Sequence, residues 1–315
     1  MSSLDIVIPT YQRGNVLLQT IEYLQAHSAV YTHLFVVDQT VYADDDPVAQ
    51  QLQELAQQNI IHWLRLPEPS IPNAMNQGLL AAQSDVVLFL DDDIIPSQNL
   101  VAEHQAAYQD SSVVAVVGQV LQPGETVLNT EGEVANAASF GSGFDSDLVF
   151  PFNSAQRRAI QNCIACNLSV RRQQAIDCGG FDRNFIAVAY RFETEFCRRL
   201  LRHSTQGLQH ATQCLFLPEA SLHHLKAPSG GTRNKVRNFL TSAQADHSVG
   251  EYYFVLQETT GMSRVWYLLR RYFGCLKARF YLRQPWWVPV RLIGETRGFL
   301  QAVSLFRQGA RYLTT

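Results

Sequence analysis

The sequence of 315 residues lacks the features that define several large classes of proteins. No stretch stays apolar and uncharged over the length that a membrane-spanning helix needs. The first residues contain no basic segment followed by an apolar one, so we expect no secretory signal peptide and a cytoplasmic protein. Internal repeats and low-complexity tracts are also missing. With 46% hydrophobic and 17% charged residues, the composition is typical of a globular protein with a large core.

Cysteine is too scarce for a disulfide-stabilised fold. The chain has six cysteines, and without an export signal we expect them to be reduced thiols. Cys163 and Cys166 are close in sequence, but no second pair or histidine follows at the spacing of a zinc ribbon. Small buried side chains are therefore a better interpretation of these cysteines than a metal site.

The motifs of the common nucleotide-binding folds are missing too. No G-x-G-x-x-G follows the first expected strand, and no Walker loop occurs in the sequence. The usual dinucleotide site and the P-loop site are therefore excluded. If the chain binds a nucleotide, something other than a glycine-rich loop must hold its phosphates.

Acidic residues are scarce near the C-terminus. From Met262 to Thr315 there are nine arginines, Lys277 and a single acid, Glu295, giving a net charge of +9. Because the whole chain carries −3, the rest carries −12. Two amphipathic helical patterns accompany this charge, which favours contact with an anionic membrane surface rather than with nucleic acid. The first pattern comprises Val265, Leu268, Leu269, Tyr272, Phe273 and Leu276, and the second Leu292, Phe299, Leu300, Val303 and Phe306.

The most informative stretch that is present is VVLFLDDDIIP, from Val86 to Pro96. A run that is apolar at every position predicts a strand covered on both faces, and ligands lie beyond the carboxyl ends of such strands. In an extended chain Asp91 and Asp93 point to one side and Asp92 to the other. Two carboxylates aimed at one point favour a hard divalent cation, while the alternative is a solvated acidic turn.

Shorter apolar runs at 4–9, 34–37 and 60–64 predict further strands, with helical patterns between them. This alternation predicts an α/β fold with a mostly parallel, Rossmann-like sheet and helices on both faces. Thr10 and Arg13 follow the first strand and Asp38 ends the second. Because the carboxyl ends of parallel strands share one edge, these side chains should meet the three aspartates there.

Eight motifs occur in the order seen in one known family. They are IVIPTYQRG, VVDQT, NAMNQG, VVLFLDDDIIP, CNLSVRR, GGFDRNF, RFETEF and HLKAPSGGTR, between Ile6 and Arg233. In this order the chain resembles the family 2 glycosyltransferases of the GT-A fold. The resemblance implies an inverting enzyme that uses a UDP-, GDP- or dTDP-sugar and Mn²⁺ or Mg²⁺. The acceptor would be a hydroxyl of a glycan or a lipid-linked molecule, in polysaccharide or glycolipid synthesis.

The resemblance also implies roles for single residues. Asp91 and Asp93 match the pair that contacts ribose and metal, and His224 matches the histidine that completes the metal site, with His223 as the alternative. Glu193 matches the general base. We expect Glu195 to be a structural partner of Arg198 or Arg199 instead. The expected donor-binding residues are Pro9, Thr10, Arg13, Asp38, Asn76, Asp91, Asp92 and Arg233.

Two departures from the family pattern leave rival functions open. Met75 stands where an arginine often faces phosphate, and Phe192 stands where an acid often precedes the base. A non-catalytic nucleotide-sugar-binding or scaffold protein is the first rival, and a nucleotidyltransferase is the second. We expect a catalytic domain over 1–235, with donor and acceptor halves at 1–120 and 121–235. A basic helical region at 236–315 would lie on the cytoplasmic face of a membrane.

Overall fold

The structure is a computed structural model, and it describes residues 2–313 except 138–142, 206–210, 232–237 and 239. Its centre is one sheet, which within the described residues has nine strands in the order β3-β2-β1-β4-β8-β6-β9-β5, with β7 beside β9. The strands are β1 (Leu4–Thr10), β2 (Leu34–Asp38), β3 (His62–Arg65), β4 (Val86–Leu90), β5 (Ile94–Pro96), β6 (Val113–Leu121), β7 (Arg158–Ile160), β8 (Asn167–Arg171) and β9 (Gln213–His224).

The direction of the strands divides the sheet. Strands β1 to β4 run parallel to one another, which confirms the predicted Rossmann-like arrangement. Strand β8 then runs antiparallel to both β4 and β6, while β6 and β9 are parallel. The fold is therefore α/β with a mostly parallel sheet in its first half and mixed pairing beyond β4.

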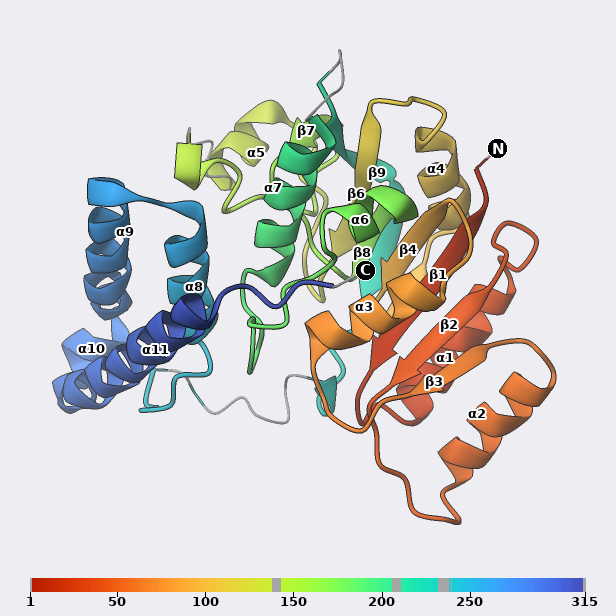
Figure 1. Cartoon of the computed structure of the whole chain (residues 1–315), viewed down its shortest axis with the longest axis horizontal. Helices are drawn as coiled ribbons and strands as arrows, with labels where there is room; N and C mark the ends of the chain where they lie inside the picture. The colour runs from red at the N-terminus through yellow and green to blue at the C-terminus, as the bar shows by residue number, and fades with distance from the viewer. Residues whose placement is uncertain (1, 138–142, 206–210, 232–237, 239, 314–315) are drawn as a thin grey trace.

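Helices cover both faces of this sheet because its strands are apolar on both sides (Figure 1). Val7 of β1 packs in one hydrophobic cluster with α3, α7 and α8, whereas its neighbours Ile6 and Ile8 pack in the other with α1, α2 and α4. The helices before the C-terminal region are α1 (Asn15–Gln25), α2 (Pro47–Gln57), α3 (Ile71–Ala81), α4 (Leu100–Ala107), α5 (Glu131–Ala137), the 3₁₀ turn η1 (Gly143–Asp145), α6 (Arg172–Asp177) and α7 (Phe192–Thr205).

Local capping chemistry explains where two of these helices begin. Asp46 accepts hydrogen bonds from the backbone of Val48 and Ala49, so α2 starts where the Asp-Pro pair predicts. Helix α1 begins at Asn15 without a side-chain cap. The turn before it needs Gly14, whose φ is 49°.

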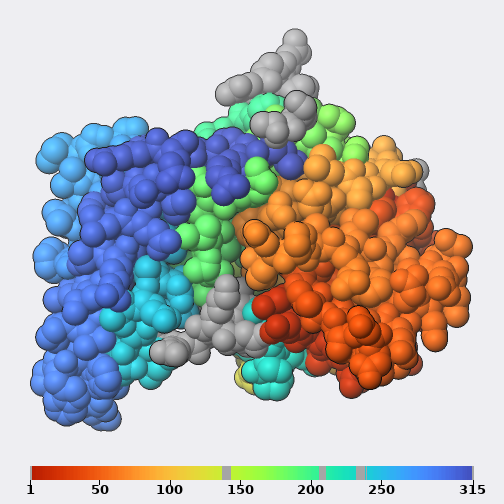
Figure 2. Space-filling model, turned by 60° about the horizontal axis from the view of Figure 1, so that its bottom comes forward, coloured from red at the N-terminus to blue at the C-terminus, as the bar shows by residue number. Residues whose placement is uncertain are grey.

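The C-terminal helices form one side of the molecule and the N-terminal residues the other (Figure 2). Tyr252, Tyr253 and Phe254 of α8 are buried in the same hydrophobic cluster as α7 and β6, and α11 packs along α8. The predicted boundary at 235/236 lies outside the described residues. No described helix is long and apolar enough to cross a membrane. The C-terminal helices are α8 (Val249–Glu258), α9 (Gly261–Gly274), η3 (Cys275–Lys277), α10 (Phe280–Arg283), η4 (Pro285–Trp287) and α11 (Val288–Gln308).

Candidate active site

The three aspartates lie where β4 ends, and they point in the alternating directions expected of an extended chain. Asp92 accepts a hydrogen bond of 2.6 Å from the Thr10 hydroxyl, on the side of β1. Asp93 Oδ1 lies 3.0 Å from His224 Nε2, and Asp91 Oδ2 lies 3.5 Å from the same nitrogen. Asp91 and Asp93 therefore converge on one histidine while Asp92 faces away from it.

His224 is brought to the aspartates by the sheet. β9 pairs antiparallel with β5, so that His224 lies opposite Ile94, directly after Asp93. The preceding His223 is exposed, as the alternation of a strand requires. One ligand atom from each of Asp91, Asp93 and His224 lies within 4.8 Å of the others. The structure thus assembles the predicted triad, and His223 is not part of it.

The chemistry of this donor set fits a divalent cation. His224 Nδ1 lies 2.9 Å from the Gln122 side-chain oxygen, which can only accept, so Nδ1 carries a proton. With Nδ1 protonated, Nε2 either carries a proton and donates it to Asp93 or, in the neutral ring, presents its lone pair to two carboxylates. The second arrangement is favoured only when a cation lies between them. Oxygen and imidazole ligands together suit Mn²⁺, and carboxylate oxygens suit Mg²⁺.

Burial opposes the ionisation of both inner aspartates, with different outcomes. For Asp93, hydrogen bonds from His224 and from the Ala227 backbone at 2.7 Å outweigh burial and hold its pKa below the ordinary value. For Asp92, burial dominates and raises the pKa to about 7, although Arg13 Nε lies 3.1 Å from its Oδ1. Asp93 is therefore the better anionic ligand of the two.

Arg13 connects the aspartates to the loop that follows β9. Its guanidinium donates to the Ser229 carbonyl at 2.9 Å and lies 3.4 Å from Asp93 Oδ2. The loop approaches so closely that a Cβ on Gly230 would lie 2.3 Å from the Gln12 carbonyl, and the φ of Gly230 is 83°. Only glycine fits this position.

A pocket of about 130 Å³ lies beside this cluster. Five predicted residues line it: Pro9, Thr10, Arg13, Asp91 and Asp92. Sequence reasoning missed the polar residues Tyr11, Gln39 and Ser70, which also line it. Of these three, Gln39 could have been predicted from the sequence, because it directly follows Asp38 in the VVDQT motif.

Two other predicted donor-binding residues, Asp38 and Asn76, do not line this pocket. Asp38 is fully buried, and its carboxylate accepts hydrogen bonds from the Thr40 backbone, Tyr42 and Trp63. Asn76 is fully buried as well, and its amide pairs with the Phe181 backbone at 2.7 Å in both directions. Arg233 lies outside the described residues.

Glu193 lies in the first turn of α7, beside the cluster. Its carboxylate accepts a hydrogen bond from the Ala165 backbone. Burial raises its pKa to about 7, and the negative charge of Asp91 adds to this shift. The dipole of α7 favours the ionised carboxylate at this first turn, but desolvation outweighs it. The result is a carboxylate that exchanges a proton near neutral pH.

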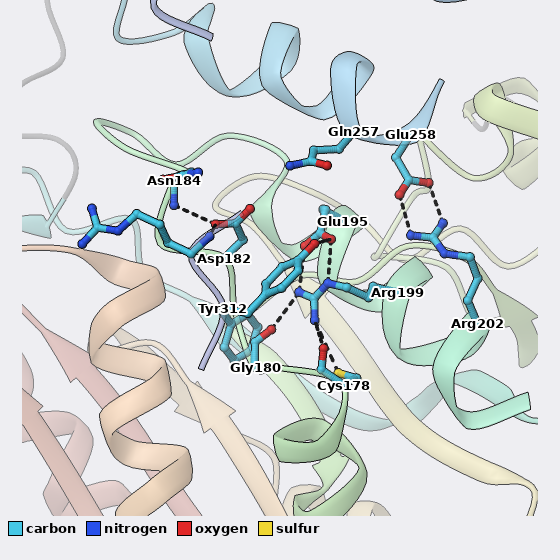
Figure 3. A network of polar contacts seen from close by, with 12 residues as sticks. Cys178, Gly180, Asp182, Asn184, Glu195, Arg199, Arg202, Gln257, Glu258 and Tyr312 are labelled. Carbon is cyan, nitrogen blue, oxygen red and sulfur yellow. Dashed lines mark hydrogen bonds and ion pairs between the residues drawn. The ribbon is translucent and has the colours of Figure 1, made fainter. Parts of the chain in front are cut away.

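Glu195, two residues further along α7, has a different environment (Figure 3). It is 1% exposed and forms a two-point ion pair with Arg199 at 2.7 and 2.9 Å. Arg199 also donates to the carbonyls of Cys178 and Gly180, and its guanidinium stacks 4.2 Å from the Tyr312 ring. The expected structural pairing of Glu195 is confirmed, with Arg199 as its partner.

The fold and this site belong to a known class of enzymes. A family model described as glycosyl transferase family 2 matches residues 5–173, and the chain belongs to that family. The protein is a glycosyltransferase. No curated protein matches the chain in sequence. The two positions that depart from the family pattern, Met75 and Phe192, are both buried in the core.

Solved structures share the fold at low sequence identity. The S. aureus protein TarS (residues 1–349) with UDP-GlcNAc has a TM-score of 0.57 and 13% identity over 98% of this chain and 93% of its own. The mannosyltransferase PcManGT from Pyrobaculum calidifontis, with GDP-Man and Mn²⁺, has a TM-score of 0.54 and 12% identity over 96% and 86%. GalNAc-T7 with UDP, GalNAc and Mn²⁺ has a TM-score of 0.56 and 13% identity over 83% of this chain. The chain covers 52% of GalNAc-T7, about half of that protein.

Proposed function

We propose that the enzyme is a metal-assisted, inverting glycosyltransferase that moves a sugar from a nucleotide-diphosphate sugar to an acceptor hydroxyl. One observation carries the proposal. Asp91, Asp93 and His224 converge within 4.8 Å, and Glu193 lies close enough to Asp91 for its pKa to respond to that charge. A cation site and a carboxylate base therefore stand together at the carboxyl edge of the sheet.

Asp91, Asp93 and His224 would hold Mn²⁺ or Mg²⁺, and two structural neighbours were crystallised with Mn²⁺. When bound, such a cation supplies a Lewis acid for the departing diphosphate. The nucleoside would lie in the pocket lined by Pro9, Thr10 and Gln39. Arg13 supplies the positive charge there, among the described lining residues. Asp38, Asn76 and Arg233 are further proposed donor-binding residues.

Glu193 would act as the general base. Its ionised carboxylate accepts the proton of the acceptor hydroxyl as that oxygen forms a bond to the anomeric carbon. The bond from the anomeric carbon to the diphosphate breaks on the opposite side, so the configuration inverts. A pKa of about 7 supports this role, because a base is most efficient when its pKa lies near the working pH.

The acceptor would approach through a pocket whose lining residues Tyr190 and Arg191 closely precede Glu193 in the chain. This pocket of about 460 Å³ is lined by Tyr190 and Arg191, and by residues of α8 and α9. Tyr190 is 48% exposed, so its ring is available to stack on a sugar. We propose donor and acceptor halves at 1–120 and 121–235 and a helical region at 236–315. The proposed acceptor is a glycan or a lipid-linked molecule.

A screen of nucleotide sugars tests the proposal. Thermal unfolding would be followed with UDP-GlcNAc, GDP-mannose and dTDP-glucose, with and without Mn²⁺, because a ligand of the native state raises the melting temperature. We expect one donor to stabilise the protein only with Mn²⁺ and then to be hydrolysed to the nucleotide diphosphate. Binding without any release would indicate a non-catalytic binder. Release of pyrophosphate would indicate a nucleotidyltransferase.

A further inference from the structure

Helix α9 carries an apolar face that no part of the described chain covers. Of its 14 residues from Gly261 to Gly274, none is buried. Its large apolar side chains at helical spacing are mostly exposed, including Met262 at 81% and Trp266 at 63%. The outer α9 face consists of Met262, Val265, Trp266, Leu269 and Phe273.

The structure divides the apolar pattern of α9 in two. Leu268 and Tyr272 turn inward and pack against the core cluster, and the Tyr272 hydroxyl lies 2.9 Å from Thr296 of α11. Most of the expected apolar face of α11 also packs inward, with Phe299, Val303 and Phe306 against the same cluster. The outer α9 face is therefore not needed to hold the helices together, and the second amphipathic pattern is explained by packing within the chain.

The apolar exposure continues along the chain into the turn after α9. Leu282 of α10 is 85% exposed and Trp286 of η4 is 64% exposed. Three of the four tryptophans of the protein lie in this region, Trp266, Trp286 and Trp287. Exposed tryptophan combined with exposed aliphatic side chains is typical of a surface that enters the boundary between lipid headgroups and acyl chains.

The charge that this part of the chain exposes has one sign, and the acids that contact α9 from other elements, Asp145 and Glu251, are paired with its Arg270 and Arg271. Lys277, Arg279 and Arg283 are exposed between Phe273 and Trp286. The only acid after Met262, Glu295, is fully buried and paired with Arg271 and Arg291. A second copy of the chain is a poor occupant, because a two-fold contact would bring these cations near their own copies. An anionic bilayer offers opposite charge and an apolar interior.

We propose that the outer α9 face and the turn from Lys277 to Trp286 dock the enzyme on an anionic membrane surface. The helix lies in the interface, with Trp266 and Phe273 in the headgroup boundary and Lys277, Arg279 and Arg283 at the lipid phosphates. The pocket lined by Tyr190 also contains Tyr267, Arg270 and Lys277 of this region. Docking would therefore bring that pocket close to the bilayer.

Vesicle sedimentation of the full chain tests this docking. The probes are phosphatidylcholine vesicles and vesicles in which roughly a third of the lipid is phosphatidylglycerol. We expect binding to the anionic vesicles alone, weakened by salt. The double variant Trp266→Ser, Phe273→Ser should bind at least about tenfold more weakly, since it removes two apolar anchors. The matched control Val41→Ser, Leu80→Ser changes two exposed apolar residues elsewhere and should bind like the wild type.

A second variant tests the charges separately from the apolar anchors. Arg279→Glu with Arg283→Glu should remove the preference for anionic vesicles. Unchanged binding by both variants, or no binding by the wild type, would overturn the proposal. So would a dimer in light scattering that the Trp266→Ser, Phe273→Ser variant abolishes, because a second copy would then be the occupant. Donor hydrolysis should persist in all of these variants. A wild type that hydrolyses no donor would refute the proposed catalytic function, whereas the vesicle results decide the membrane docking.

Discussion

Two groups of carboxylates each include a glutamate of α7, and they differ in how their charge is balanced. In the strand-end cluster, Asp91 and Asp93 converge on His224, and Glu193 lies close enough to Asp91 for that charge to raise its pKa. In the network of Figure 3, each glutamate has its own arginine, Glu195 with Arg199 and Glu258 with Arg202. In our proposal a bound cation completes the first group, whereas arginines already complete the second.

This difference separates the proposed catalytic residue from a structural residue within a single helix. Glu193 and Glu195 are two residues apart on α7, and burial raises the pKa of both. For Glu195 the Arg199 guanidinium opposes that shift, and the pair is closed by further hydrogen bonds. For Glu193 the neighbouring Asp91 reinforces it. Glu193 can therefore take up a proton near neutral pH, whereas Glu195 stabilises the fold through its ion pair with Arg199.

Removal of the cation should have the largest effect on this comparison. We expect EDTA to abolish transfer, and Asp93→Asn to lower Mn²⁺ affinity by more than about 10²-fold, because an amide cannot replace the lost anionic charge. Calorimetry measures the Mn²⁺ affinity, and the rate of donor hydrolysis is measured in parallel. Glu258→Gln in the balanced network is the control and should keep its Mn²⁺ affinity. Full activity after EDTA treatment would remove the metal from the account.

Disruption of the balanced network should instead lower stability. Glu195→Gln leaves Arg199 buried without the negative charge of its partner, and breaking a buried ion pair typically costs about 3–5 kcal/mol. Chemical denaturation of the variant should show this loss in the free energy of unfolding. Its donor hydrolysis per folded molecule should stay near that of the wild type. A stable but inactive Glu195→Gln would show that the two glutamates have been assigned the wrong way round.

A smaller effect is expected from the residue behind the metal site. Gln122→Ala removes the acceptor that holds His224 Nδ1, and loss of such an outer partner typically costs about 10–100-fold in metal affinity. His223→Ala is the control, since His223 is exposed and adjacent. Equal Mn²⁺ affinity of the two variants would argue against the proposed orientation of His224.

The pH dependence of transfer should reveal the ionisation of the Glu193 carboxylate. Glu193 has a raised pKa of about 7, so below that pH it is increasingly protonated and cannot accept another proton. At saturating Mn²⁺, we expect transfer to fall by about tenfold per pH unit on the acidic side. A rate that stays constant from well above to well below this pKa would exclude Glu193 as the base.

The sequence predicted those parts of the site that depend on neighbours in the chain. The aspartates follow a strand that is apolar at every position, and the alternation of that strand determines which two share a ligand. The Asp46-Pro47 start of α2 was equally local. The family pattern added His224 and Glu193, which come from distant parts of the chain.

The parts that were missed depend on contacts far along the chain. The donor-binding roles expected of Asp38 and Asn76 stay predictions, but the contacts that hold these two side chains were not foreseen. Tyr42 and Trp63 donate to Asp38 Oδ2, and the Asn76 amide pairs with Phe181, 105 residues away. For α9, the sequence shows an apolar stripe without showing which part of it packs. Such contacts follow from the tertiary fold and leave no periodic signal.

The most direct test of the account separates the base from the cation site in one variant. Single-turnover hydrolysis of the donor would be measured for Glu193→Gln together with its affinities for Mn²⁺ and the donor. We predict that the rate falls by about 10²–10⁴-fold while both affinities stay those of the wild type. A Glu193→Gln enzyme that hydrolyses the donor at the wild-type rate would contradict the account, because the Glu193 carboxylate would then have no role in catalysis.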